Sequence, residues 1–351
     1  MMKRISISGL YIALAIVLAA GCAKEVETGP NDANKRYVEA WMHLYNTNNN
    51  TDIQPTELGA YVLEETVGDG TKITDKGYVI VEYKATDLNG NISQFTDSTT
   101  ARQLGKYNRT TYYGPEVWLT MDETIPAGVQ EAVVGMNVGG SKKVMIPAWL
   151  MTYSKYDTAE EYLSKETESS NIIYEFTVRD FTDSINVWQI DNIKKYIEKN
   201  YGSVSAFQND TVGFYYRQVA APSNSKEFTK DAKVYINYTG KLLNGLVFDT
   251  NIEKVAKDNG LYSTAYTYEP IPVNWGERYG ELTMGSGDTQ MITGFARTLW
   301  QMKADEKGIG IFYSPLGYGH SGSGASIPSY APLIFEIEIV KSEDKDEDIE
   351  V

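Results

Sequence analysis

Apolar and polar residues alternate along two stretches of the chain, 77–90 and 232–245, and each stretch ends in an Asn-Gly pair. Alternation of this kind is typical of half-buried β-strands, and Asn-Gly favours a tight hairpin turn. In the later stretch the inward face ends in Tyr238. A second strand that returns from the turn would bring Phe248 and Asp249 back toward this tyrosine. The pattern therefore predicts a corner of a binding site with two aromatic rings and a carboxylate.

Most of the remaining chain also reads as two copies of one pattern. Three blocks recur in the same order: a strand and turn at 77–90 and 232–245, a short amphipathic helix at 125–136 and 291–302, and a closing strand at 171–181 and 332–342. Matching blocks in one order indicate a duplicated domain. Each copy has a run of strands interrupted by one short helix, without regular strand-helix alternation. This arrangement predicts an α+β fold in which a curved antiparallel sheet wraps over a helix.

Helical spacing marks two further elements outside the copies. One is an N-terminal helix around Trp41, which we expect to pack on the following domain, with a role in dimerisation as the alternative. The other carries a stripe through Ile190, Ile193 and Ile197 and connects the two copies. The expected organisation is a signal peptide at 1–21, a tether and helix at 22–50, a first domain at 51–183, a connecting helix at 184–205, a second domain at 206–342 and an acidic tail at 343–351.

Composition excludes several classes of function. The 351 residues carry a net charge of −15, from 47 acidic and 32 basic residues, which argues against binding to nucleic acid or to an anionic lipid surface. The only histidines are His43 and His320, which lie far apart in the sequence and have no cysteine beside them. A histidine-based metal site or a Ser/His/Asp triad therefore has little material. We expect neither a metal ion nor a cofactor.

The N-terminus has the pattern of an export signal. Lys3 and Arg4 precede an apolar run from 5 to 20, which ends in the sequence LAAGC at 18–22. This ending resembles the lipobox of bacterial lipoproteins, and the resemblance implies cleavage before Cys22 and acylation of its thiol. An ordinary signal peptide followed by an unrelated thiol is the alternative. A lipid anchor would hold the protein on a membrane of the bacterial cell envelope, and we expect the outer membrane.

Three segments of the second copy resemble the macrolide-binding FKBP family of peptidyl-prolyl isomerases. YTGKLLNGLVFD at 238–249 matches the family pattern Y-T-G-x-L-x-x-G-x-x-F-D at every fixed position. MITGFARTLWQM at 291–302 matches V-I-x-G-W-x-x-x-L-x-x-M, with methionine for valine and Phe295 for tryptophan. LGYGHSGSGASIPSYAPLIFEIEIV at 316–340 matches L-G-Y-G, a glycine-rich loop, I-P and a closing strand. Together these segments cover most of 211–342.

The resemblance implies two FKBP-like domains and a proline pocket in the second. It implies that Phe295 forms the floor, that the backbone N–H of Ile292 contacts a substrate carbonyl, that Tyr318 can donate its hydroxyl, and that Asp249 belongs to a polar wall. None of these groups is a nucleophile. The residues carried over to the pocket are Tyr238, Phe248, Asp249, Met291, Ile292, Phe295, Tyr318, Ile327 and Phe335.

The first copy departs from the family pattern. Tyr83 keeps the strand tyrosine, but Phe95 and Asp97 stand out of register with the Phe-Asp pair, and Val129 replaces the aromatic floor. A valine gives a proline ring little to pack on, so we expect the first domain to be inactive. The second copy contains an aromatic insertion at 250–281, which could form a lid over the pocket or a loop packed on the sheet.

The leading hypothesis is therefore a lipid-anchored peptidyl-prolyl cis-trans isomerase that assists the folding of exported proteins. Its partners would be proline-containing polypeptides, with a membrane contact through Cys22. One alternative is a non-catalytic chaperone or assembly lipoprotein that uses the same fold. Another is a subunit of a surface complex that docks through the first domain.

Overall fold

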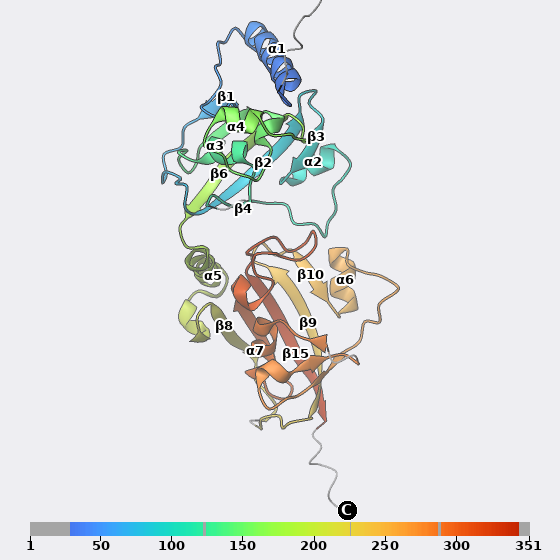
Figure 1. Cartoon of the computed structure of the whole chain (residues 1–351). Helices are drawn as coiled ribbons and strands as arrows, with labels where there is room; N and C mark the ends of the chain where they lie inside the picture. Colours follow the sequence, from blue (N-terminus) through green and yellow to red (C-terminus); the bar gives the residue numbers. More distant parts are fainter. Residues whose placement is uncertain (1–28, 122–123, 225, 287–288, 344–351) are drawn as a thin grey trace, which may run out of the picture.

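The computed structural model describes residues 29–121, 124–224, 226–286 and 289–343, which form two antiparallel sheets stacked end to end (Figure 1). The predicted α+β class is confirmed. The signal peptide, Cys22 and residues 344–351 of the acidic tail lie outside the described residues. No helix within the described ranges is long and apolar enough to cross a membrane.

The first sheet has six strands in the order β1-β5-β6-β2-β3, with β4 also paired to β2. Its strands are β1 (Tyr61–Thr66), β2 (Tyr78–Asp87), β3 (Ile92–Phe95), β4 (Glu116–Leu119), β5 (Ser141–Ile146) and β6 (Ile172–Thr182). Its helices are α2 (Ser98–Gln103), α3 (Ala127–Val133), α4 (Ala159–Leu163) and the 3-10 turn η1 (Ala148–Leu150). Helix α3 covers the inner face, where Val129 and Val133 are buried against Val81 and Ile146.

Helix α1 (Asp32–Asn49) packs on this first sheet unit, as expected, although Tyr37 and Leu44 of the predicted apolar spacing are exposed (Figure 1). Val38 and Met42 are buried in the same core as the sheet. The buried side chain of Asn31, at the start of the helix, donates hydrogen bonds to the carbonyl oxygens of Leu163 and Lys165, at 3.0 and 2.6 Å. These contacts join the helix to the end of α4.

The second sheet has nine strands in the order β13-β12-β11-β9-β15-β14-β8-β7, with β10 also paired to β9. Its strands are β7 (Gln208–Thr211), β8 (Phe214–Ala220), β9 (Lys233–Leu242), β10 (Val247–Thr250), β11 (Ile271–Asn274), β12 (Thr283–Met284), β13 (Thr289–Gln290), β14 (Lys307–Phe312) and β15 (Leu333–Glu343). Its helices are α6 (Glu253–Asn259), α7 (Thr293–Trp300) and the 3-10 turns η2 (Val204–Ala206), η3 (Tyr279–Glu281) and η4 (Ser314–Leu316).

Helix α5 (Ile185–Tyr201) follows the first sheet in the chain and packs on the second. Ile193 and Ile197 are fully buried in one cluster with Ile309, Ile311 and Ile334 on the outer face of the second sheet. Helix α7 lies on the opposite face (Figure 1). The second sheet is therefore covered on both sides, and α7 is on the side that carries the inward residues of β9.

The hairpin between β9 and β10 differs from a two-residue turn. Gly245 has a positive φ of 89°, as the Asn-Gly pair predicts, but Asn244 does not. The amide of Leu242 donates to the carbonyl of Leu246, so the loop is longer than predicted. The ladder then shifts between Val247 and Asp249, which makes a β-bulge at Phe248. A bulge changes the direction of the side chains beside it, and this one is next to the predicted site.

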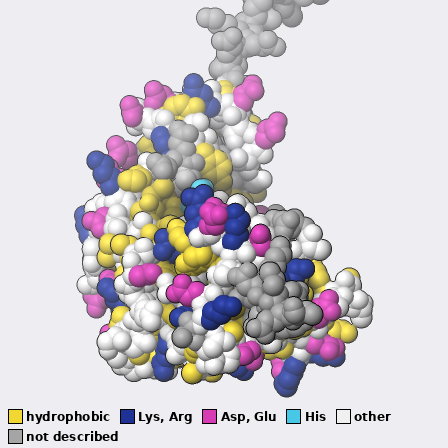
Figure 2. Space-filling view, turned by 90° about the horizontal axis from the view of Figure 1, so that it is seen from below, with side chains coloured by type: hydrophobic (Ala, Val, Ile, Leu, Met, Phe, Trp, Pro, Cys, Tyr) yellow, Lys and Arg dark blue, Asp and Glu magenta, His cyan; other side chains and the backbone are white. Residues whose placement is uncertain are grey.

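Charged side chains of both signs are interspersed on the surface. On the face shown in Figure 2, lysine and arginine side chains stand among aspartate and glutamate side chains, with hydrophobic groups between them. Several form exposed ion pairs, such as Lys230 with Glu277 at 2.8 Å and Lys307 with Glu338 at 2.9 Å. Exposed pairs of this kind contribute little to stability.

Candidate functional site

Tyr238 lies on the inner face of β9, where a set of buried hydrogen bonds fixes its backbone. Its amide donates to Oδ1 of Asn251 at 2.7 Å, and its carbonyl accepts from the hydroxyl of Thr250 at 2.7 Å. The side chain of Asn251 also donates to the carbonyls of Ile236 and Glu269, both at 2.9 Å. Asn251 is thus the residue that ties β9 to the start of the insertion. No pattern in the sequence pointed to Asn251, although it follows the Phe-Asp motif by only two positions.

The hydroxyl of Tyr238 donates a hydrogen bond to Oδ2 of Asp249 at 2.8 Å. The tyrosine is only 6% exposed, whereas Asp249 is exposed. Burial, followed by the negative charge of Asp249 and this hydrogen bond, raises the pKa of Tyr238 well above its ordinary value. The pair therefore presents a protonated phenol held in one orientation by a carboxylate at the edge of the sheet.

The ring of Tyr238 belongs to a group of packed rings that also includes Phe295, Phe335 and Phe312. Phe295 of α7 lies edge-on to Tyr238, with ring centroids 5.4 Å apart, and edge-on to Phe335 at 4.8 Å. Phe335 of β15 also lies 6.2 Å from Tyr238 and stacks on Phe312 of β14 at 5.9 Å. Phe295 is 3% exposed and Phe335 4%. Edge-to-face packing of this kind is favourable beyond the burial of area, so the rings are held in fixed positions.

Phe248 completes what we call the aromatic cluster, defined as Tyr238, Phe248, Phe295 and Phe335. Its ring lies edge-on to Phe335 at 5.6 Å, so it joins the cluster through Phe335. Gly240 makes this arrangement possible. A Cβ on Gly240 would come within 2.6 Å of Phe248 and 2.9 Å of Phe335, both shorter than real Cβ contacts. The two rings cover the bare backbone of β9 at this point.

Met291 and Ile292 lie at the start of α7, half-buried against the same core. Ile292 is the N-cap residue, with extended backbone angles, and its carbonyl accepts from Ala296. Its own N–H makes no hydrogen bond to any described residue. The first N–H groups of a helix have no partner within the helix, so this one can donate to a carbonyl oxygen from outside.

Tyr318 and Ile327 belong to the loop between β14 and β15. Ile327 is buried in one core cluster with Tyr238, Phe295 and Phe335. Tyr318 is 37% exposed, and burial followed by the charge of Asp249 raises its pKa, which indicates that its hydroxyl lies near that carboxylate. The structure thus brings all nine predicted residues to one end of the second sheet, from β9, β10, α7, β15 and the loop before β15.

The first sheet repeats part of this geometry with different residues. Tyr83 and Tyr174 have ring centroids 6.0 Å apart, close to the 6.2 Å of Tyr238 and Phe335. They also hold matching ladder positions, since Tyr174 lies opposite Ala85 as Phe335 lies opposite Gly240.

Trp118 of β4 contacts the ring of Tyr83 at 5.1 Å and is 8% exposed. It also lies edge-on to Tyr174 at 6.4 Å, so it contacts both rings as Phe295 does in the second sheet, and Val129 of α3 is buried in the same core. Burial raises the pKa of Tyr83 and of Glu116. Tyr83 itself is half-buried and is among the residues that line a cavity of the first sheet. No spacing in the sequence predicted the contribution of Trp118.

The register explains the departure of Phe95. In the first sheet, Phe95 lies opposite Lys84, which is one position beyond Tyr83. In the second sheet, the Phe-Asp pair ends with Asp249 opposite Gly240, which is two positions beyond Tyr238, so the two phenylalanines do not hold equivalent positions. Asp97 accepts from the amide of Thr100 at 2.7 Å and caps helix α2. The Phe-Thr-Asp stretch of the first copy therefore belongs to a helix start.

The insertion at 250–281, which contains α6 and β11, is divided in its packing. Trp275 is 5% exposed and stacks on Trp300 at 5.6 Å, and Tyr279 lies under the guanidinium of Arg297 at 4.4 Å. In the middle of the insertion, by contrast, Tyr262 and Tyr266 are 43% and 72% exposed. The end of the insertion is a loop packed on the sheet, and its middle presents tyrosines to solvent.

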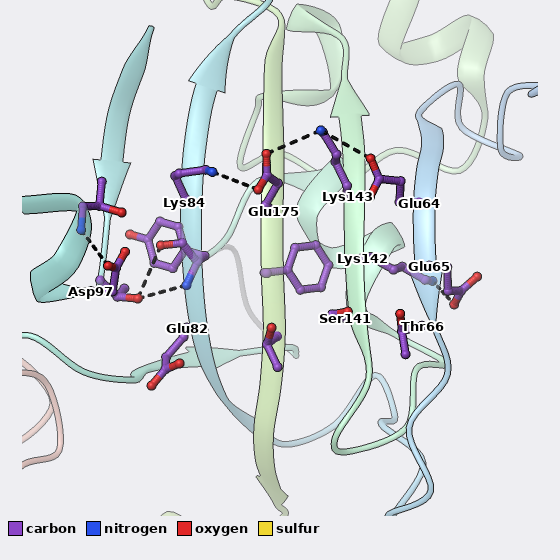
Figure 3. A pocket seen from close by; sticks show the side chains of 15 residues that line it. Glu64, Glu65, Thr66, Glu82, Lys84, Asp97, Ser141, Lys142, Lys143 and Glu175 are labelled. Atoms are coloured by element: carbon purple, nitrogen blue, oxygen red, sulfur yellow. Dashed lines mark hydrogen bonds and ion pairs between the residues drawn. The ribbon is translucent and has the colours of Figure 1, made fainter. Parts of the chain in front are cut away.

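A cavity of about 550 Å³ lies on the first sheet, away from the aromatic cluster (Figure 3). Its charged groups already pair with one another: Lys84 with Glu175 at 2.9 Å, and Lys143 with both Glu175 and Glu64. We therefore place the candidate site at the aromatic cluster, where Ile292 has an unpaired donor and Tyr318 is exposed. No group of residues within the described ranges could hold a metal ion.

Comparisons with known proteins match the part of the chain that forms the second sheet. The family model for FKBP-type peptidyl-prolyl cis-trans isomerases matches residues 224–340. The FK506-binding protein of Neisseria meningitidis serogroup B is 31% identical over 116 residues, which is 33% of this chain and 84% of the relative. The macrophage infectivity potentiator of Trypanosoma cruzi is 24% identical over 160 residues, or 44% of this chain and 68% of the relative. The chain belongs to the FKBP-type peptidyl-prolyl cis-trans isomerase family.

Solved structures were compared as well. FkpA from Escherichia coli is 20% identical, with 46% of this chain and 63% of that chain covered and a TM-score of 0.31. The three FKBP domains of wheat FKBP73 cover 84% of this chain at 14% identity and a TM-score of 0.29. Both scores are below 0.5, so the family assignment rests on the sequence matches.

Gly240→Ala tests whether the bare backbone supports the aromatic cluster. The added methyl would push Phe248 and Phe335 apart, and we expect the free energy of unfolding to fall by about 1–3 kcal/mol. Gly280→Ala is the matched control, because a Cβ there meets nothing within 4 Å. Urea denaturation measures both, and equal stabilities of the two variants would contradict the assignment.

The raised pKa of Tyr238 predicts how the protein titrates. Because the folded pKa lies above the unfolded value of about 10, the contribution of the protonated phenol to stability is complete below about pH 10 and is lost as the pH rises further. Tyrosinate absorbance of the folded wild type and of Tyr238→Phe should therefore superimpose up to about pH 11. One extra tyrosinate in the wild type near pH 10 would show that the phenol is not held as described.

Proposed function

We propose that the second sheet catalyses cis-trans isomerisation of X-Pro bonds in exported polypeptides, at the aromatic cluster and its rim. Membership of the FKBP-type isomerase family supports the reaction class. The observation that carries the location is the position of Phe295, which meets Tyr238 and Phe335 edge-on beside the unpaired N–H of Ile292.

The chemistry requires no reactive side chain. Rotation about the peptide bond faces a barrier of about 18–20 kcal/mol because resonance gives the C–N bond partial double-bond character. The twisted amide has lost this resonance and is less polar than the planar one. An apolar surface of Phe295, Phe335 and Phe248 around the proline ring would therefore favour the twisted state over the planar ground state.

The polar groups at the rim would fix the geometry of the bound peptide. The N–H of Ile292 would donate to a substrate carbonyl, and the hydroxyl of Tyr318 is available as a second donor. The hydroxyl of Tyr238 already donates to Asp249 at 2.8 Å, so this pair would act as a rigid wall. Donors that are already oriented need no reorganisation when the amide twists.

We assign no isomerase activity to the first sheet. Trp118 packs on Tyr83 at 5.1 Å, and Val129 stands where the second sheet has the ring of Phe295. A valine gives a proline ring little to pack on. The comparison between Tyr83 and Tyr238, which hold equivalent strand positions, provides the control for the activity test.

The activity test uses the same substitution at both positions. We expect Tyr238→Phe to lower kcat/KM on a proline peptide by about two- to tenfold, because the hydrogen bond to Asp249 is lost and the carboxylate is released. Tyr83→Phe should leave kcat/KM unchanged. Exchange NMR on a proline peptide measures both rates. Equal rates with and without the wild-type protein would refute the isomerase proposal, and equal losses in both variants would refute its location.

We propose further that the protein acts on clients in the bacterial cell envelope, anchored at the outer membrane through an acylated Cys22. The lipobox-like sequence at 18–22 and the polar stretch after it support this location. The net charge of −15, with charges of both signs interspersed on the surface, supports polypeptide clients over nucleic acid.

The anchor is tested with Cys22→Ser in the full-length protein expressed in a bacterium. We expect the wild type to incorporate a labelled fatty acid and to sediment with membranes, and the variant to do neither. A wild type that takes up no label would contradict the proposal, even if it sedimented with membranes for another reason.

A further inference from the structure

A second cavity, of about 440 Å³, lies between the two sheets, and we call it the seam cleft. The first sheet unit contributes Tyr112 and Pro115, α5 contributes Trp188 and Asn192, and the second sheet unit contributes Leu243 and the segment 328–332. Volumes of this size are typical of ligand sites. No acidic or basic side chain is among the described residues that line it, although the chain as a whole carries a net charge of −15.

The walls of the seam cleft are held by contacts across the seam. The amide of Tyr112 donates to the carbonyl of Ala325 at 2.8 Å, and the rings of Tyr78 and Tyr330 meet edge-on at 5.6 Å. Tyr330 has a φ of 60°, an uncommon conformation for a residue other than glycine. The buried side chain of Gln189 accepts from the amide of Ser314 at 2.7 Å and fixes α5 against the second sheet. The cleft is therefore formed before any ligand arrives.

The seam cleft shares a wall with the candidate isomerase site. Ile327 is buried in the core of the aromatic cluster, and Pro328, the next residue, lines the cleft. Consecutive Cα atoms are only about 3.8 Å apart, so one loop separates the two surfaces. Another cavity, of about 410 Å³, adjoins the seam cleft, because Tyr112 and Pro328 line both. A polypeptide bound at the cluster could thus cross the loop and continue into the cleft.

We propose that the seam cleft binds the client polypeptide beside the isomerised proline, and that it selects an extended, uncharged segment rich in apolar or proline residues. This inference rests on the proposed isomerase function. Aromatic side chains that line a groove are the usual receptors for extended proline-rich segments. The side chain of Asn192 makes no hydrogen bond to a described residue, so its amide is available to a peptide backbone.

The described chain begins beside α1 and ends below β15, at opposite ends of the molecule, while the cleft lies between the two sheets (Figure 1). A second copy of the chain is an alternative occupant, and the experiment separates it from a client by measuring oligomeric state.

The test uses two labelled peptides with the same central proline. The short peptide carries only the residues next to the proline, and the long peptide adds an uncharged apolar extension on one side, prepared in both directions. We expect the full-length wild type to bind one of the long peptides about tenfold more tightly than the short one in fluorescence anisotropy, as for a well-packed apolar contact.

Asn192→Trp should abolish this difference by filling the cleft. Asn200→Trp is the matched control, since Asn200 lies on the same helix and is exposed. Leu243→Ser provides a second variant, which removes part of the apolar lining without filling the space. Neither cleft variant should change the isomerisation rate of the short peptide, because neither residue touches the aromatic cluster.

The outcomes separate the two proposals. Equal affinities of short and long peptides for the wild type, or a long-peptide advantage that survives both Asn192→Trp and Leu243→Ser, would refute the seam cleft as a client site. A dimer that Asn192→Trp converts to a monomer would assign the cleft to a second copy and also refute it. Lack of isomerisation of the short peptide would refute the isomerase proposal, while the anisotropy difference would still report on the cleft.

Discussion

The aromatic cluster of the second sheet depends on the absence of a side chain at Gly240. Two rings, from Phe248 and Phe335, lie over the backbone at this residue, closer than any Cβ would permit. With Phe335 in this place, Phe295 can meet it and Tyr238 edge-on at the same time. The bulge at Phe248 adds to this, because it lets Phe248 and Asp249, which are neighbours in the chain, lie on the same face of the sheet. A strand without the bulge would send these two side chains to opposite faces.

The two sheets share the position of one tyrosine but surround it with different residues. Both place a tyrosine at the same ladder position, with a second ring about 6 Å away. In the second sheet the third ring comes from α7 and the carboxylate from β10. In the first, Trp118 and Glu116 both come from β4, and the indole packs on the tyrosine. Side chains on a neighbouring strand thus change what surrounds the tyrosine without any change in the sheet itself.

The seam between the sheets places the loop before β15 between two surfaces. Ile327 is buried in the core of the second sheet, and residues on either side of it, Ala325 and Tyr330, are held by the first sheet unit through Tyr112 and Tyr78. A loop held on both sides keeps its donors in place, which a free loop of this length, with several glycines, would not do. The first sheet unit therefore helps to hold the loop that carries Tyr318 and Ile327.

The sequence by itself determined the strands of the second sheet, the α+β class and the family, and it predicted the nine residues that the structure brings to one end of that sheet. The strands follow from alternation and the family from motif spacing, because the direction of a side chain along one strand is a local property. Tertiary structure decided the roles of Asn251 and Trp118, the bulge at Phe248 and the seam cleft. Each of these depends on which distant segments pack together, and the packing energy of such contacts is spread over many residues without leaving a period or spacing in the chain.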